Sequence, residues 1–225
     1  MIVSHKYKFI YLRTEKTAST SLSTALDEIL DTGDFVARPF QAKWVKRLPK
    51  SPGALKRHLP LMFGLHTHAS ASQARMVLGR KIFDSYYKFS VERNPWERQL
   101  SLYTQRIHKE EKHKTVENFD TDMRDWFWRA RYYTRLKNWP IYAIGDQVVA
   151  DHVIQYHDLE TGLRHVFDQI GIASTLELPR FRASPSGERA PYARYYSAAT
   201  RDLVANWYAR EIKAFGYSFE GEPAR

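Results

Sequence analysis

A lysine surrounded by small and hydroxyl-bearing residues is the first candidate for chemistry. Residues 13–22 read RTEKTASTSL and lead into a segment whose apolar residues have helical spacing. A helix N-terminus presents N–H groups and the positive end of the helix dipole, and small side chains let an anion approach it. Hydroxyl groups add donors and Lys16 adds a charge, so this turn is a candidate phosphate- or sulfate-binding site.

The turn differs from the phosphate loop of nucleoside triphosphatases. Those enzymes carry Gly-x-x-x-x-Gly-Lys-Ser/Thr, whereas no glycine lies between residues 1 and 32 of this chain. An ordinary hydroxyl-rich helix start is therefore an equal alternative for this segment taken alone.

A second candidate turn lies around Arg93. The apolar run 86–91 predicts a buried strand, and Asn94, Pro95 and Glu97 form a favourable helix start directly after it. The sheets of α/β proteins place ligand-binding groups at the ends of their strands. The planar guanidinium group of an arginine suits a phosphate, because it can donate two parallel hydrogen bonds. Ser101, two helical turns on, is a candidate for the same ligand, while the alternative is an ion pair between Arg93 and a helix end.

Two histidines, His66 and His68, are candidates for a general base, because imidazole titrates near neutral pH. Their alternate spacing predicts an extended segment with both side chains on one face. A metal site needs a third ligand that the neighbouring sequence does not offer. A buried, hydrogen-bonded histidine is the other alternative, and Glu15 and Glu92 are the nearest candidates for a glutamate base.

The elements that must position these residues alternate along the chain. Strands are predicted at 7–12, 86–91 and 151–157, and each is followed by a helix. This alternation predicts an α/β protein with three α/β/α layers and a central, mostly parallel sheet. We expect one domain over residues 1–225, with basic and aromatic insertions at about 32–62 and 108–139 that flank an acceptor cleft.

Helix ends are predicted from single residues. The first helix covers about residues 20–30, and residues 108–139 are also expected to be largely helical. The later helices are expected to begin at Asp158 and Ser197 and to end at Gly171 and Gly216.

Composition narrows the class of protein and of ligand. The chain has 225 residues, a net charge of +10 and no cysteine, which favours anionic ligands and excludes disulfides and thiolate chemistry. No apolar run approaches the length of a membrane span, and the amino terminus lacks the apolar core of a signal peptide. We therefore expect a cytoplasmic protein, and the sequence leaves peripheral contact with a membrane and the oligomeric state open.

Both candidate turns resemble segments of one known family. Residues 16–22, KTASTSL, resemble the Pro-Lys-Thr-Gly-Gly-Thr-Ser-Leu segment of sulfotransferases that use 3′-phosphoadenylyl sulfate (PAPS). Residues 93–98, RNPWER, with Ser101 and Tyr103, resemble the Arg-Asn-Pro-Phe/Trp-Asp/Glu-Arg…Ser-x-Tyr segment of the same superfamily. The best match is to its carbohydrate branch, which includes the uronosyl 2-O-sulfotransferases and many small bacterial relatives. The resemblance implies a P-loop-like fold.

The resemblance also implies roles for individual residues. The first turn holds the 5′-phosphosulfate, Lys16 contacts the leaving phosphate, and His68, or else His66, is the base. Arg93 and Ser101 hold the 3′-phosphate, the product is 3′,5′-adenosine bisphosphate, and no metal takes part. Two departures are Glu15 in place of the family's proline and Ala18-Ser19 in place of Gly-Gly. The expected cofactor-binding residues are Arg13, Lys16, Thr17, Ala18, Ser19, Thr20, Ser21, Arg93, Ser101, Arg182, Ser184 and Arg189.

The expected reaction is sulfuryl transfer to a hydroxyl group of a carbohydrate or glycolipid. Basic and aromatic residues in 38–58 and 106–137 are candidates for contacts with such an acceptor, although exposed helix faces explain them equally well. The alternatives are a P-loop-type nucleotide kinase or phosphotransferase and a basic nucleic-acid-binding domain. The missing glycines count against the first, and no nucleic-acid-binding motif supports the second, so we expect no nucleic-acid partner.

Overall fold

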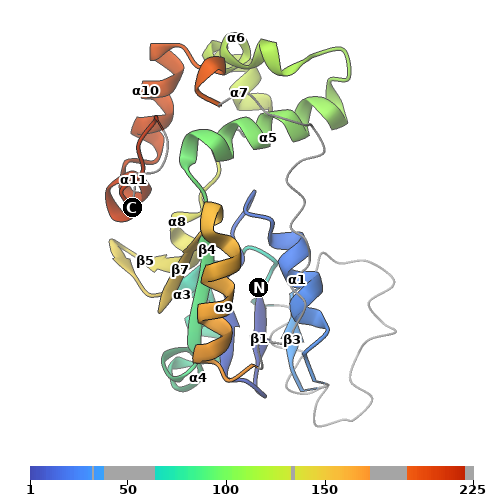
Figure 1. Ribbon diagram of the computed structural model, residues 1–225, viewed down its shortest axis with the longest axis vertical. Coiled ribbons are helices and arrows are strands. Elements are labelled where there is room, and N and C mark those ends of the chain that lie inside the picture. The colour runs from blue at the N-terminus through green and yellow to red at the C-terminus, as the bar shows by residue number, and fades with distance from the viewer. Residues whose placement is uncertain (32, 38–63, 133–134, 173–191, 221–225) are drawn as a thin grey trace. The chain divides into compact units, whose positions relative to one another are not determined.

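The computed structural model describes residues 1–31, 33–37, 64–132, 135–172 and 192–220 (Figure 1). The chain divides into two compact units. The first unit comprises residues 1–92 and 138–181, and the second comprises 93–137 and 182–225.

A sheet forms the centre of the first unit. Among the described residues it has five strands, in the order β3 (Phe35–Val36), β1 (Ile2–Ser4), β2 (Phe9–Tyr11), β4 (Tyr87–Glu92) and β7 (His152–Gln155). Strand β1 pairs antiparallel with β2 and β3, whereas β2, β4 and β7 pair in parallel. Within this sheet, all strands except β1 therefore run in one direction. The three predicted strands are confirmed, and β1 and β3 are additional.

Alternate residues of β2 and β4 bury one face of this sheet under α1 (Ser19–Asp27) and α9 (Leu159–Gln169). The rings of Tyr11 and Phe89 stack with their centroids 5.0 Å apart. Helix α9 lies close against β7, because a Cβ at Gly162 would meet Ile154 Cγ2 at 2.4 Å. The core on this face consists of Phe9, Tyr11, Leu22, Leu26, Phe89, Val91, Ile154, Leu163, Val166 and Phe167 with their neighbours.

The opposite face of β4 is also covered by helices. Lys88 Nζ lies 5.7 Å from the centroid of the Phe83 ring in α4 (Arg80–Ser85), and the Tyr142 hydroxyl in α8 (Trp139–Tyr142) donates to Glu92. Helices on both faces agree with the predicted layers. The elements on this side are α3 (Ala71–Leu78), α4 (Arg80–Ser85) and α8 (Trp139–Tyr142), with the hairpin of β5 (Ala143–Ile144) and β6 (Gln147–Val148).

The second unit is helical in its described part, and three of its helix boundaries follow predicted signals. Asn94 caps the longest of these helices by accepting a hydrogen bond from the Trp96 N–H, at 3.1 Å. Ser197 caps α10 (Ala198–Trp207) together with Thr200, and Gly216 ends α11 (Ala209–Phe215) in the left-handed conformation. The α-helices are α5 (Pro95–Glu110), α6 (Phe119–Arg124), α7 (Trp126–Tyr132), α10 (Ala198–Trp207) and α11 (Ala209–Phe215).

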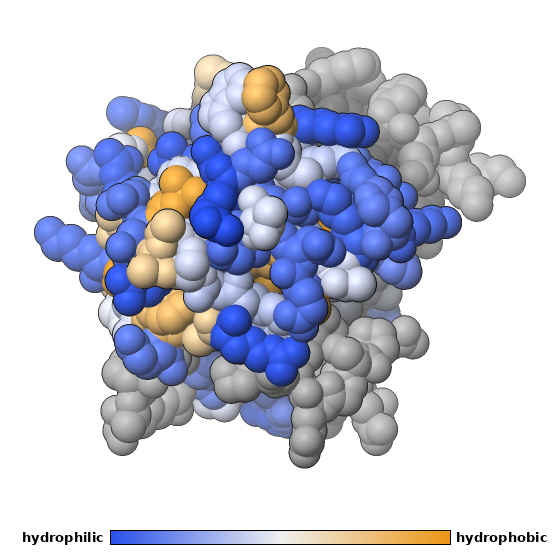
Figure 2. Space-filling view, turned by 90° about the horizontal axis from the view of Figure 1, so that it is seen from above, coloured by the Kyte–Doolittle hydropathy of each residue, from blue (hydrophilic) through white to orange (hydrophobic). Residues whose placement is uncertain are grey.

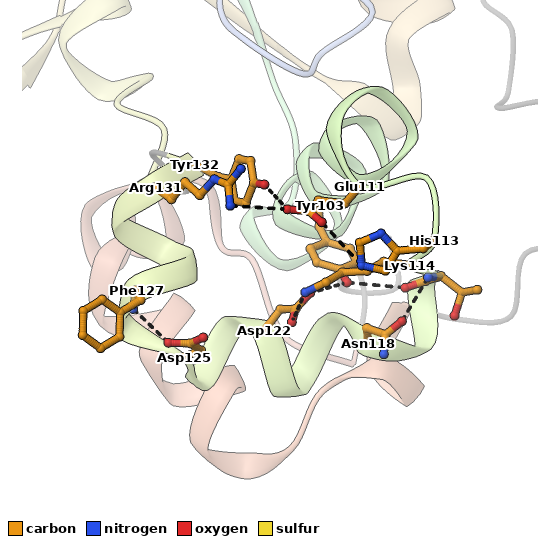
Figure 3. A network of polar contacts seen from close by, with 11 residues as sticks. Tyr103, Glu111, His113, Lys114, Asn118, Asp122, Asp125, Phe127, Arg131 and Tyr132 are labelled. Atoms are coloured by element: carbon orange, nitrogen blue, oxygen red, sulfur yellow. Dashed lines mark hydrogen bonds and ion pairs between the residues drawn. The ribbon is translucent and has the colours of Figure 1, made fainter.

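Polar contacts hold the turn between α5 and α6 (Figure 3). The buried carboxylate of Asp122 accepts hydrogen bonds from the Tyr103 hydroxyl, at 2.8 Å, and from Lys114 Nζ, at 2.7 Å. Burial and the hydrogen bond to Asp122 raise the pKa of Tyr103. Glu111 accepts from the Tyr132 hydroxyl and so joins the start of the turn to α7.

The described part of residues 108–139 is largely helical, as predicted, in several short helices with breaks between them. Two other local predictions are wrong in detail. The last predicted helix is interrupted at Tyr208. Asp158 makes no side-chain cap, since residues 156–158 already form a 3-10 turn before α9 begins. Across the described ranges, no helix has the length and apolar character to cross a membrane.

Candidate functional site

The turn between β2 and α1 contains two left-handed residues. Lys16 has φ 62° and Ala18 has φ 55°. Helix α1 begins directly after Ala18, and the Leu22 N–H donates to the Ala18 carbonyl oxygen at 3.1 Å. Since alanine has no side-chain acceptor, Ala18 cannot cap the first N–H groups of α1, unlike a serine or asparagine in this position. These N–H groups are the donors that bind anions at helix N-termini.

Two buried threonines hold this turn against the sheet. The Thr14 hydroxyl donates to the Val91 carbonyl oxygen of β4 and lies 2.9 Å from the Thr17 hydroxyl. The Arg13 guanidinium donates to the Thr20 hydroxyl at 3.1 Å, across the turn. The side chains of Thr14 and Thr17 therefore support the turn, and Lys16, Thr20 and Ser21 retain contact with solvent.

The left-handed conformation of Ala18 explains why the family segment that residues 16–22 resemble has a glycine at this position. The left-handed conformation costs a residue with a Cβ about 1–2 kcal/mol of conformational free energy, whereas glycine does not have this cost. We expect Ala18→Gly to raise the free energy of unfolding by about 1 kcal/mol, measured by urea denaturation. The control is Ala205→Gly in α10, which we expect to lower it by about 0.5–1 kcal/mol because Ala205 is helical. Equal losses in both variants would contradict this explanation.

His68 is hydrogen-bonded to the residue that opens the turn. Its Nδ1 lies 2.9 Å from the carbonyl oxygen of Arg13. A carbonyl oxygen only accepts, so Nδ1 carries the proton and the neutral ring keeps the Nε2 lone pair for another proton. Burial lowers the pKa of His68 below its ordinary value of 6.5, and the imidazole is therefore neutral at pH 7.

His66 lies in a different setting. Its side chain is exposed and its Nδ1 accepts a hydrogen bond from the His68 backbone N–H, at 3.2 Å. The Ala69 N–H donates to the His66 carbonyl oxygen at 3.1 Å, which makes the segment a turn. The predicted extended conformation is therefore wrong, because these local hydrogen bonds close the chain on itself. No group of three or more potential metal-ligating side chains occurs within the ranges that the structure describes.

Of the two glutamates considered as a base, Glu92 is enclosed by protein. It is fully buried at the end of β4, where it accepts hydrogen bonds from the Tyr142 hydroxyl at 3.0 Å and from Asn138 Nδ2 at 3.4 Å. Its carboxylate is therefore not exposed to solvent. Asn138 also contacts the backbone of Glu15, and no sequence signal marked it, since Glu15 is 123 residues away.

The remaining candidates belong to the second unit or lie outside the described residues. Arg93 is buried at the start of α5 and forms an ion pair with Glu97. The alternative role that the sequence left open for Arg93, an ion pair at a helix end, is therefore present. Ser101 lies partly buried on α5. Arg182, Ser184 and Arg189 lie outside the described residues.

Comparisons with known proteins give the family of this chain. An uncharacterized protein of Archaeoglobus fulgidus is 30% identical over 106 residues, which span 45% of this chain and 81% of that protein. No solved structure matches the chain. The model of the sulfotransferase family matches residues 1–218 and thus includes both candidate turns. The chain therefore belongs to the sulfotransferase family, whose members transfer sulfuryl groups.

Proposed function

We propose that the protein transfers the sulfuryl group of PAPS to a hydroxyl group of a carbohydrate or glycolipid. The observation that supports this proposal best is the first turn. It combines Lys16, a helix N-terminus without a side-chain cap and a neutral histidine hydrogen-bonded to Arg13. Together these provide donors for a phosphosulfate and a base for an acceptor hydroxyl.

The donor groups of the turn fit the chemistry of the 5′-phosphosulfate. Backbone N–H groups at the start of α1, the hydroxyl groups of Thr20 and Ser21, and the Lys16 ammonium group all donate to anionic oxygens. Arg13 stays near this ligand because it is hydrogen-bonded to Thr20. Arg93 and Ser101 are the proposed ligands of the 3′-phosphate, and Arg182, Ser184 and Arg189 are proposed further contacts.

The reaction then needs one base and one cation. When bound, PAPS supplies the sulfuryl group and a phosphate leaving group. His68 Nε2 accepts the proton of the acceptor hydroxyl as the new oxygen–sulfur bond forms. Lys16 donates to the bridging oxygen, on which charge develops while the old sulfur–oxygen bond breaks. The bisphosphate product leaves with that electron pair.

Exposed aromatic side chains favour a carbohydrate acceptor. Trp126 and Phe127 have 63% and 77% of their surface exposed, and their rings contact each other with centroids 5.0 Å apart. Aromatic faces of this kind pack against the C–H groups of sugars. Figure 2 shows a largely hydrophilic face in which hydrophobic residues form small, separate groups. A hydroxyl-rich ligand with apolar ring faces suits this type of surface better than a large apolar ligand.

Ligand-induced stabilisation tests the choice of donor. We expect 3′,5′-adenosine bisphosphate to raise the melting temperature, because a ligand that binds only the folded state adds about 2.7 kcal/mol at 100 times its Kd. Arg93→Ala is expected to weaken this binding about 10- to 100-fold, because this is the contribution that charge-assisted hydrogen bonds to a phosphate make to affinity. Differential scanning fluorimetry over a series of ligand concentrations provides the measurement.

The controls separate the alternative functions. Glu97→Ala removes the carboxylate that pairs with Arg93 but keeps the guanidinium, and we expect the bisphosphate still to bind. A larger shift with ATP and magnesium would favour a nucleotide kinase. A larger shift with a short oligonucleotide, lost steeply as salt is added, would favour a nucleic-acid-binding domain.

A further inference from the structure

Asn138 connects three separate parts of the first unit through one side chain. It is fully buried directly before α8, a position in which asparagine commonly caps the helix that follows. Its side chain makes no cap bond to α8. Instead, Asn138 Oδ1 accepts from the Glu15 N–H at 3.0 Å, and Nδ2 donates to the Glu15 carbonyl oxygen at 3.1 Å. One carboxamide thus binds both backbone polar groups of Glu15.

This pair of hydrogen bonds fixes two peptide planes of the first turn. In a trans peptide the C=O and the following N–H point in opposite directions. Because the Glu15 carbonyl points at Asn138, the Lys16 N–H points away from it. Likewise the Thr14 carbonyl points away from Asn138, and it lies 3.4 Å from the Thr17 hydroxyl. Lys16 has an unfavourable positive φ of 62°. The hydrogen bonds that Asn138 makes to the preceding residue, Glu15, therefore help to fix this conformation.

The second hydrogen of Asn138 Nδ2 is directed to Glu92, whose Oε1 lies at 3.4 Å. The Tyr142 hydroxyl donates to the other oxygen of that carboxylate. Only an amide supplies this position with one acceptor and two donors. One oxygen of an aspartate at this position would still accept from the Glu15 N–H. Its other oxygen would replace the donor Nδ2 and would face two acceptors, the Glu15 carbonyl oxygen and the Glu92 carboxylate.

We propose that Asn138 is a positioning residue for the anion-binding turn, which holds the Glu15–Lys16 peptide in the orientation that donor binding requires. The proposal extends the proposed function, since it takes this turn as the phosphosulfate site. It also assigns Glu92 a structural role rather than that of a base: its Oε1 accepts from Asn138 Nδ2, as the side-chain oxygen of a glutamine would also do.

Three variants separate positioning from general stability. Asn138→Asp removes both donors and places two buried carboxyl groups side by side, so we expect a lower melting temperature and at least tenfold weaker binding of 3′,5′-adenosine bisphosphate. Glu92→Gln is the matched control, which leaves the Asn138–Glu15 pair intact, and we expect affinity within twofold of wild type. In the double variant, which combines Asn138→Asp with Glu92→Gln, the introduced amide donates to the introduced carboxylate, while the Glu15 carbonyl still lacks its donor.

The double variant gives the decisive comparison. We expect its melting temperature to recover by at least half, whereas its affinity for the bisphosphate, measured by isothermal titration calorimetry, stays at least tenfold below that of Glu92→Gln. Recovery of affinity in parallel with melting temperature would show that Asn138 only stabilises the fold and would overturn the proposal.

Amide hydrogen exchange without ligand tests the inference independently of the donor. We expect the Lys16 and Thr17 amides to exchange at least tenfold faster in the double variant than in Glu92→Gln, with no change at Phe89 in β4. Unchanged exchange in the turn would sink the positioning role, whatever the donor is. If wild type binds no bisphosphate but the difference in exchange is present, the proposed donor is wrong and the role of Asn138 in shaping the turn stands.

Discussion

Replacing His68 with asparagine is expected to lower kcat about 10²- to 10⁴-fold, the usual contribution of a general base. Asparagine is the matched substitution, because its amide nitrogen takes the place of Nδ1 and still donates to the Arg13 carbonyl oxygen. The turn therefore keeps its hydrogen bond, and only the Nε2 acceptor is lost. Transfer of labelled sulfate from PAPS to a panel of glycans and glycolipids measures kcat, and calorimetry should show bisphosphate affinity within twofold of wild type.

His66→Ala decides between the two histidines. His66 is exposed and its Nδ1 is bound to the backbone of His68, so we expect kcat to fall far less than in His68→Asn. A larger loss in His66→Ala than in His68→Asn would move the role of base to His66. Full activity of His68→Asn would remove His68 from the mechanism.

The pH profile provides a second check on His68. A base must be unprotonated, so kcat/KM should fall as the pH drops through the pKa of the folded protein. Burial lowers that pKa below 6.5, and the fall should therefore lie on the acid side of 6.5. In His68→Asn this acid limb should disappear from the remaining activity. A limb centred above 6.5 in the wild type would point to a different group.

Replacing Lys16 with methionine is expected to lower kcat about 10²- to 10³-fold, as the loss of one donor to a developing oxyanion does in other enzymes. Methionine keeps most of the length of the side chain but removes the charge. Since the charge on the leaving oxygen grows toward the transition state, affinity for the bisphosphate should fall less than kcat. Initial rates with labelled PAPS and calorimetry with the bisphosphate give the two quantities.

Lys16→Arg is the matched control for charge. It keeps the cation but changes its geometry, and its kcat should lie between those of Lys16→Met and the wild type. Equal activity of Lys16→Met and wild type, with an unchanged melting temperature, would show that Lys16 does not act on the leaving group.

Local sequence signals predicted the elements whose causes are local. Asn94, with Pro95 after it, indicated the start of α5, and Gly216 indicated the end of α11, because a cap or a left-handed glycine works within one turn of a helix. The three parallel strands were also recognisable, since each is a short apolar run followed by a helix. The turn with Lys16 was identified from residue types alone, although its two left-handed residues were not.

The features that could not be predicted depend on partners far along the chain. Strand β1 is only three residues long and pairs with β2 and with β3, around residue 35, so no local pattern separated it from the following strand. Asn138 contacts Glu15 and Glu92 at separations of 123 and 46 residues. A single sequence contains no periodicity that links such positions.

The hydrogen bond between Glu92 and Asn138 has a consequence for how this chain tolerates change in length. Segment 93–137 leaves the first unit after Glu92 and returns at Asn138, and these two residues are in contact, with Nδ2 and Oε1 3.4 Å apart. An excursion whose ends are neighbours can be lengthened at a cost of about 0.6 kcal/mol for each doubling of a flexible loop. Because this closing contact lies within the first unit, we expect a change in the length of a connection between the helices of 93–137 to leave the register of the sheet unchanged.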